Sequence, residues 1–178
     1  MIRETDALRF ACEQHAEQTR KGHRPEPFVL HPLRVARRLL AHDLDDPELI
    51  SAALLHDVLE DTDCPPEEIE QRFGPEVLHI VRELTDDKEL LKSLRKQYQV
   101  ERANLLGLKA RLIRIADKTD NVADLVEDPP AGWSLHRRRD YVAWARRVVD
   151  RIRGTHPGLE DEFDHTAQRV WNHLTGSP

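Results

Sequence analysis

DPELISAALLHDVLED, residues 46–61, is the stretch that decides the fold. It opens with an Asp-Pro pair, a helix start signal, because Asp caps a first turn and Pro fits the first helical position. Residues 52–55 are apolar nearly all round, which predicts a buried helix. The polar pair His56-Asp57 follows directly, so we expect these two side chains beside the core.

The rest of the chain also reads as helices. The stretch 21–32 contains Gly and Pro and interrupts the first pattern as a loop. The segment 86–104 is charged and weakly patterned, and we expect it to be helical with a mobile portion. Helical patterns or boundary signals mark residues 5–20, 32–41, 65–74, 75–84, 86–104, 108–127, 134–153 and 157–174. No segment reads as a strand, so the predicted fold class is all-α, a compact multi-helix bundle.

Composition supports one domain spanning residues 1–178. A chain of 178 residues is of ordinary single-domain size and can bury a core without disulfides or a structural metal. Only 7 residues are Gly, and helix-forming residues dominate. Cys12 and Cys64 form no C-x-x-C pair, so neither a disulfide framework nor a cysteine-rich zinc site is expected.

Charge and hydropathy narrow the possible partners. The formal net charge of -6 does not favour wholesale binding to nucleic acid. The N-terminal sequence MIRETDALRF lacks the apolar stretch of a signal peptide, and no segment approaches the roughly 20 apolar residues of a membrane span. We therefore expect a cytoplasmic protein that acts on a small molecule, not on nucleic acid or a membrane. The pattern carries no signal for oligomeric state.

The hexapeptide HDVLED, residues 56–61, concentrates groups that can do chemistry. Glu60 lies four residues after His56, and Asp61 four after Asp57, so each pair shares a helix face. Acids held together repel one another unless a cation or protons neutralise them, which favours a metal site. The alternative is a solvated acidic helix end, which opposes the helix dipole. This segment alone leaves both interpretations open.

Two further residues bear on that choice. His31 stands beside a Pro, where a His commonly caps a helix or fills space. Asp117 follows the apolar pair Ile115-Ala116 and needs a partner, because unpaired buried charge is expensive. A salt bridge to Lys118 or an Arg is its structural alternative.

The order of these residues resembles that of the HD metal-dependent phosphohydrolases. In that superfamily a His, a His-Asp pair and a later Asp, here within IADKTDN, provide the metal ligands. Two imidazoles and two carboxylates suit Mn²⁺, Fe²⁺ or Zn²⁺ better than an all-oxygen Mg²⁺ or Ca²⁺ cage.

A narrower resemblance is carried by longer pieces. HPLRVARRLL, AALLHDVLEDTD, RFGPEVLHIVRELTDDK and IADKTDNVADL look like the hydrolase domain of the RelA/SpoT homologues. GWSLHRRRDYVAWARRVVDRIRGT resembles the single-domain small alarmone hydrolases, of the metazoan SpoT homologue type. Together these pieces cover roughly residues 5–165.

The resemblance implies a helical HD-domain fold with a metal site in its core and a Mn²⁺-dependent reaction that removes the 3′-pyrophosphate of (p)ppGpp, leaving GDP or GTP. Another divalent transition metal is compatible with the same ligands. The implied metal ligands are His31, His56, Asp57 and Asp117. Glu60 and Asp61 match the family's catalytic acidic pair, which orients or deprotonates the attacking water.

The same resemblance assigns a substrate side. The implied nucleotide-contacting residues are Arg20, Lys21, Lys92, Asn121, Arg137 and Tyr141. Arg20 would stack on the purine and Lys21 would meet phosphate. These two could instead form a basic helix end, Asn121 could bond backbone, and Arg137 belongs to a basic run that is usually a solvated face.

Three positions depart from the family pattern. Phe28 replaces a Tyr, so a hydroxyl contact is lost. Thr119-Asp120 stands where the family commonly has Leu followed by an aromatic residue or His. We expect this pair to alter the pocket floor and to leave the metal site untouched.

Three alternatives stand beside the alarmone hydrolase. The first is a related phosphohydrolase acting on an adenosine alarmone or on the 2′-phosphate of NADPH. The second is a non-catalytic HD module that binds a nucleotide, which the presence of Glu60 and Asp61 disfavours. The third is nucleic-acid binding through residues 133–153, where aromatic and basic residues alternate, although net charge opposes it.

Overall fold

The computed structural model describes residues 4–24 and 26–176. The ends of the predicted 1–178 domain, including the first three residues of MIRETDALRF, lie outside the described residues. Its helices are α1 (Glu4–Gln14), α2 (Leu30–Ala41), α3 (Pro47–Leu55), α4 (Val58–Asp61), α5 (Pro66–Phe73), α6 (Pro75–Leu84), α7 (Lys92–Arg102), the 3₁₀ turn η1 (Ala103–Leu105), α8 (Leu108–Glu127), α9 (Leu135–Asp150) and α10 (Pro157–Thr175). Within this described part the β-type pairing is one isolated bridge, Thr19 to Pro27, so the all-α prediction is confirmed.

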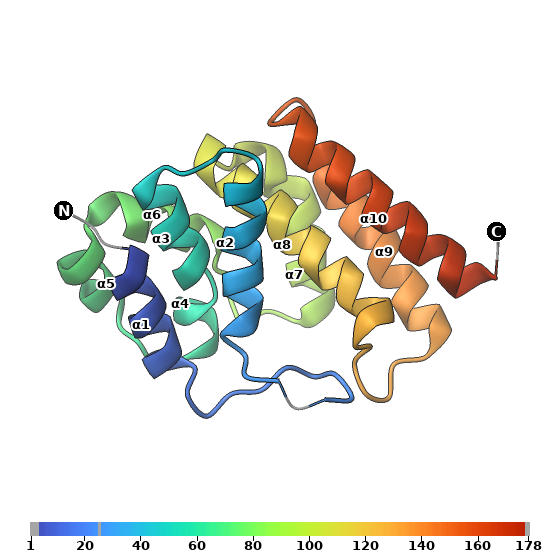
Figure 1. Cartoon of the computed structure of the whole chain (residues 1–178), viewed down its shortest axis with the longest axis horizontal. Coiled ribbons are helices and arrows are strands. Elements are labelled where there is room, and N and C mark those ends of the chain that lie inside the picture. Colours follow the sequence, from blue (N-terminus) through green and yellow to red (C-terminus); the bar gives the residue numbers. More distant parts are fainter. Residues whose placement is uncertain (1–3, 25, 177–178) are drawn as a thin grey trace.

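Helix α8 is the axis of the molecule. It packs against α2, α6, α9 and α10 and also touches α3. Figure 1 shows α8 between the α9–α10 pair on one side and α1, α3, α5 and α6 on the other. Side chains on different faces of α8 therefore meet both halves of the bundle.

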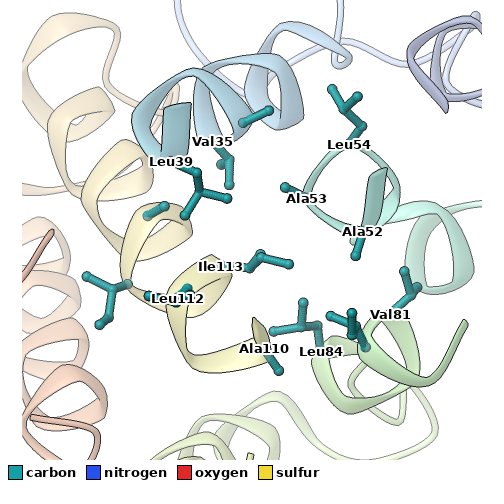
Figure 2. Close-up of a cluster of buried hydrophobic side chains, with 14 of the residues drawn as sticks. Val35, Leu39, Ala52, Ala53, Leu54, Val81, Leu84, Ala110, Leu112 and Ile113 are labelled. Atoms are coloured by element: carbon teal, nitrogen blue, oxygen red, sulfur yellow. The ribbon is translucent and has the colours of Figure 1, made fainter. Parts of the chain in front are cut away.

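The core lies where α2, α3, α6 and α8 converge. Figure 2 shows Val35 and Leu39 of α2, Ala53 of α3, Leu84 of α6 and Ile113 of α8 around one interior space. All five are buried, with at most 4% of their surface exposed. Every residue of α3 from Leu49 to Leu55 is buried, so the prediction of a buried helix is confirmed.

Helix α3 begins where the sequence indicates, but it stops at Leu55, so HDVLED does not continue it as one unbroken helix. Asp46 caps it, with Oδ1 accepting the Leu49 N–H at 2.8 Å, and Pro47 occupies the first turn. The helix ends at Leu55, and the single turn of α4 resumes at Val58. His56 and Asp57 therefore occupy a break between two helices, directly beside the core.

Helix α1 is shorter than predicted, because it ends at Gln14 and not near residue 20. Beyond it, the Phe28 N–H donates to the carbonyl of Gln18 at 3.0 Å, and the Arg20 N–H to that of Glu26 at 2.9 Å. These cross-loop bonds replace the bonds that a continued helix would make.

The remaining boundaries follow the predictions closely. Gly74, with φ 90°, separates α5 from α6. The weakly patterned segment 86–104 is helical from Lys92 onward. None of the helices in the described part is both long and apolar enough to cross a bilayer.

Candidate active site

Four side chains from α2, α8 and the break after α3 meet at one point. His31 lies in the first turn of α2, and Asp117 in the middle of α8. One ligand atom from each of His31, His56 and Asp117 lies within 4.8 Å of the others. Asp57 adds its Oδ2, which is 3.7 Å from His31 Nε2 and 3.4 Å from His56 Nε2. The fold thus brings together the four residues that the sequence proposes as metal ligands.

The two imidazoles are held so that each Nε2 faces this point. His56 Nδ1 donates to the Ala53 carbonyl at 2.7 Å, which leaves Nε2 with the lone pair. His31 Nδ1 lies 2.8 Å from Asp120 Oδ2. Histidines that bind metals show this arrangement, with the second ring nitrogen anchored to a carbonyl or carboxylate.

His56 Nε2 provides a direct test of whether a cation fits. It is buried and has no hydrogen-bond partner among the described residues. An unsatisfied buried acceptor costs about 1–3 kcal/mol, so native structures rarely keep one without a reason. A divalent cation between the two Nε2 atoms and the two carboxylates would satisfy it, and this mixed donor set suits a transition metal.

The electrostatics of the cluster favour a positive charge at its centre. Burial lowers the pKa of His31, but hydrogen bonds to Asp117 and Asp120 outweigh it and raise the pKa to about 9. Burial disfavours ionised Asp117, yet the charge of Lys118 and the contact with His31 hold the pKa of this carboxyl well below its usual range. A proton on His31 or a bound cation would meet the same demand, and His31 would have to release that proton to hold a metal through its neutral imidazole.

The two carboxylate oxygens of Asp117 contact different sets of side chains. Oδ1 lies 3.3 Å from His31 Nε2 and accepts from Asn121 Nδ2. Oδ2 lies 3.0 Å from Lys118 Nζ and 3.9 Å from Arg114 Nη1. The salt bridge considered as an alternative role therefore exists, and it orients Oδ1 toward the histidines.

Glu60 stands one turn beyond the break, in α4, beside the four-residue cluster. Its Oε2 accepts the Asp86 N–H at 3.2 Å, and its Oε1 lies 3.5 Å from Arg95 Nη1. Burial raises the pKa of Glu60 to about 7, and the charges of Asp86 and Asp57 act in the same direction. A carboxyl poised near neutral pH is suited to accept a proton.

Asp61, the second member of the predicted acidic pair, is more open. Its Oδ1 accepts from Lys88 Nζ at 2.6 Å, and the pair is partly exposed. Its backbone carbonyl accepts from Gln18 Nε2, which ties the loop after α1 to α4.

A cavity of about 310 Å³ opens over the cluster. The predicted site residues in its lining are His31, Asp57, Glu60, Asp61, Asp117, Arg20, Lys21, Lys92, Asn121 and Tyr141. Two predicted residues do not line it. His56 lies behind the others and reaches the cluster through Nε2, and Arg137 stacks on the outside of Trp133, 4.2 Å from the ring centroid. Arg137 was expected to contact the nucleotide directly, but it contacts Trp133, which lines the cavity.

Lys21, Lys92 and Arg137 form a basic group at the cavity on the side of α7. The pKa of Lys92 is lowered by burial and then by the charges of Arg137, Lys21 and Arg95. Neither Lys21 nor Lys92 has an ion-pair partner among the described residues. Cations gathered without counter-charges are suited to bind a polyphosphate.

Arg20, by contrast, is already paired with other side chains of the cavity. Its Nη2 donates to Asp124 Oδ2 at 2.6 Å and to Asn121 Oδ1 at 3.0 Å, and its guanidinium lies 5.8 Å from the Phe28 ring centroid. Phe28 also packs on the His15 ring at 4.7 Å between centroids. The aromatic ring therefore serves packing at this position without a hydroxyl.

Thr119 and Asp120, the other two departures from the family pattern, lie away from the cavity. Thr119 and Asp120 do not line the cavity, so the expectation that they alter its floor is wrong. Thr119 Oγ1 donates to the Ile115 carbonyl at 2.8 Å, inside the helix packing. Asp120 contacts His31, so this departure from the family pattern does reach the four-residue cluster, contrary to expectation.

Sequence reasoning missed Asp120 as a site residue and Lys118 as part of the cavity wall. Lys118 lines the cavity, with Nζ 4.5 Å from the Trp144 ring centroid. Helical spacing held a signal for Asp120, because it lies three residues after Asp117 and thus near the same face of α8.

Comparisons with known proteins agree with this fold and cluster. The HD domain family matches residues 7–142, more than half of the sequence, and the chain belongs to this family. A more particular likeness is to guanosine-3′,5′-bis(diphosphate) 3′-pyrophosphohydrolase MESH1. The Drosophila melanogaster protein of that name is 44% identical over 160 residues, covering 89% of both chains. The Xenopus tropicalis protein is 46% identical over 162 residues, covering 90% of both.

A solved structure of a related protein has the same fold. It is described as a metazoan ortholog of SpoT that hydrolyzes ppGpp and plays a role in starvation responses. It superposes with a TM-score of 0.90 at 42% identity, covering 93% of this chain and 94% of that one. The chain therefore matches these relatives over nearly their whole length, which supports the predicted small alarmone hydrolase type.

Proposed function

We propose that this protein is a divalent-metal-dependent hydrolase that removes the 3′-pyrophosphate from (p)ppGpp, yielding GDP or GTP and pyrophosphate. The observation that carries the proposal is the convergence of His31, His56, Asp57 and Asp117 under a cavity with a basic wall. The names of the relatives, which match nearly end to end, support the guanosine substrate. We place the activity in the cytoplasm.

The four clustered residues would hold the metal, for which we propose Mn²⁺. When bound, such a cation polarises a phosphoryl oxygen and makes water more acidic. The protein contributes the orientation of both imidazoles and the ionised state of Asp117. Residues 1–178 would form a single HD-type phosphohydrolase domain.

Glu60 would accept the proton of the attacking water, and Asp61 would help to orient that water. Glu60 is held at the cavity edge by the Asp86 N–H and Arg95, so its position does not depend on substrate. A bound cation next to Asp57 lowers the pKa of Glu60 from its metal-free value of about 7, which leaves the carboxylate ready to act as a base.

The nucleotide would lie in the cavity. Lys21 and Lys92 meet its phosphates, with Arg137 adding positive charge from behind Trp133. Arg20 and Asn121, which are bonded to each other, also line the cavity, and Tyr141 packs beside Trp133 with a centroid distance of 5.8 Å.

One experiment tests substrate and reaction together. Metal-free protein would be supplied with Mn²⁺, Mg²⁺ or Zn²⁺ and offered ppGpp, pppGpp, ppApp or NADPH, with pyrophosphate and orthophosphate measured separately. Pyrophosphate released from the guanosine alarmones with Mn²⁺ supports the proposal. Orthophosphate from NADPH, or a clear preference for ppApp, would replace the substrate. Tight metal binding without any turnover would point to a non-catalytic module.

The loop that carries Lys21 depends on a glycine. Asp128 Oδ1 accepts the His23 N–H at 2.9 Å, and a Cβ on Gly22 would lie 1.7 Å from Asp128 Oδ2. Gly22→Ala therefore displaces this carboxylate from the loop. We expect a loss of about 1 kcal/mol in nucleotide binding, which is about fivefold in KM, with kcat and Mn²⁺ affinity nearly unchanged.

Steady-state kinetics on Gly22→Ala and on the control Gly107→Ala measure this effect. Gly107 does not line the cavity, and its new Cβ would meet the flexible end of Glu83. An unchanged KM in Gly22→Ala would show that the close approach to Asp128 does not position the loop.

A further inference from the structure

Asp120 is a buried carboxylate that reaches the proposed metal centre from behind. It lies on α8 three residues after Asp117, and 1% of its surface is exposed. Its Oδ2 is 2.8 Å from His31 Nδ1, on the side of the ring opposite Nε2. Asp117 and Asp120 therefore contact the two nitrogens of the same imidazole.

The charge of Asp120 is balanced from α2. Arg34 Nε lies 3.0 Å from Oδ1 and 3.1 Å from Oδ2, so it bridges both oxygens. Arg38 Nη2 adds a weaker contact at 3.5 Å to Oδ1. A buried carboxylate without such partners would cost several kcal/mol, so Arg34 makes an ionised Asp120 tolerable at this depth.

Arg34 is itself fixed in place. Its Nη2 lies 3.3 Å from Asp124 Oδ2, which also accepts from Arg20. One face of α8 thus carries Asp117, Asp120 and Asp124 at helical spacing, and the three carboxylates hold side chains of α2 and the cavity wall.

We propose that Asp120 is a positioning residue of the metal centre, and that Arg34 holds it in place. Asp120 accepts the His31 Nδ1 proton, which leaves the lone pair on Nε2, and it fixes the ring plane so that Nε2 faces Asp57 and Asp117. The inference rests on the proposed metal site and names a residue beyond its four ligands. Partners of this kind typically contribute 10- to 100-fold to metal affinity or activity.

A merely structural role for Asp120, as an ion pair between α2 and α8, predicts a different result. Such a pair would affect the stability of the metal-free fold and would leave the affinity of the folded protein for a cation unchanged. Metal affinity measured on folded protein therefore separates the two roles, and it needs no assumption about substrate.

The test is calorimetric titration of Mn²⁺ into metal-free protein, with circular dichroism to establish folding. The variants are Asp120→Ala, Asp120→Asn and Arg34→Gln. Glu127→Gln is the matched control, because Glu127 lies on α8 and its ion pair within the described part of the chain is with exposed Arg169. His31→Ala reports on the proposed metal site itself.

We expect Asp120→Ala to weaken Mn²⁺ binding by about 10- to 100-fold, and Asp120→Asn by about tenfold, because an amide oxygen still accepts but carries no charge. Arg34→Gln should weaken binding in the same direction and by less. At saturating Mn²⁺ the kcat of Asp120→Asn should recover. If Asp120→Ala does not fold, Asp120→Asn decides the question alone.

Mn²⁺ affinity within twofold of wild type in the folded Asp120 variants, with His31→Ala strongly impaired, would overturn the inference and keep the metal site. Unchanged affinity in His31→Ala would instead refute the metal site. An unimpaired Arg34→Gln would remove Arg34 from the proposal.

Discussion

Asp117→Asn is expected to lose at least about 100-fold in Mn²⁺ affinity, because a direct ligand should matter more than a partner behind it. Its Oδ1 lies 3.3 Å from His31 Nε2 and 3.9 Å from His56 Nε2, so it touches both halves of the cluster. The amide keeps the size of the side chain and an acceptor for Lys118, so the fold should survive better than in Asp117→Ala. Titration of Mn²⁺ into the metal-free variant measures the loss.

Two comparisons make this result specific. Glu127→Gln removes a carboxylate from the same helix at a distance from the cluster and should bind Mn²⁺ as wild type does. Circular dichroism of metal-free Asp117→Asn should show wild-type helix content. A variant that is folded and binds Mn²⁺ normally would exclude Asp117 as a ligand.

Glu60→Gln is expected to reduce kcat by about 10²- to 10⁴-fold while Mn²⁺ affinity stays within about twofold. The glutamine can still accept the Asp86 N–H, but it cannot take a proton from water. Steady-state kinetics at saturating Mn²⁺ would measure the first effect, and titration the second. A fully active Glu60→Gln would contradict the role of Glu60 as the base.

The same residue predicts the pH dependence of turnover. The reaction needs ionised Glu60, so kcat/KM of the wild type should fall about tenfold per pH unit below the pKa of Glu60 in the loaded enzyme. Because a cation next to Asp57 lowers that pKa, the acid limb should lie at or below the metal-free value of about 7. Glu60→Gln should lack this limb.

The stability of the metal-free protein should depend on pH in the opposite direction to turnover, because protonation of Glu60 stabilises the fold. The pKa of Glu60 is raised from 4.5 to about 7 on folding. Its stabilising contribution to the free energy of unfolding is therefore fully present below about pH 4.5 and is lost as the pH rises toward 7. Above that pH an ionised carboxylate, 20% exposed, remains in the folded state. Glu60→Gln should therefore raise the free energy of unfolding by about 2–3 kcal/mol at pH 8 and change it little near pH 4.5. Equal denaturation curves at pH 8 would show that burial does not cause the shift.

The resemblance to the HD phosphohydrolases named the four candidate metal ligands, and local signals predicted where two parts of that set lie. His56 and Asp57 follow a capped apolar helix, and Asp117 follows an apolar pair on a long amphipathic one, so both positions had to lie at the edge of the core. The capping of α3 by Asp46 and the end of α5 at Gly74 are likewise local signals, and the structure confirms them.

What the sequence did not predict depends on contacts between distant segments. Helix α1 stops early because residues 18 and 20 bond backbone groups near residue 27, which periodicity does not reveal. Asp120 lies 89 residues from His31, and its orientation follows from how α2 packs on α8. Helix α8 turns the Asp120 carboxylate away from the cavity and toward Nδ1 of His31.

Tryptophan side chains in the cavity lining should make ligand binding detectable by intrinsic fluorescence. The chain has three tryptophans, and two of them, Trp133 and Trp144, line the cavity. Trp171 lies on α10, outside that lining. A purine bound in the cavity would alter the emission of these two indoles more than that of Trp171, so we expect that ligand binding can be followed by intrinsic fluorescence without a label.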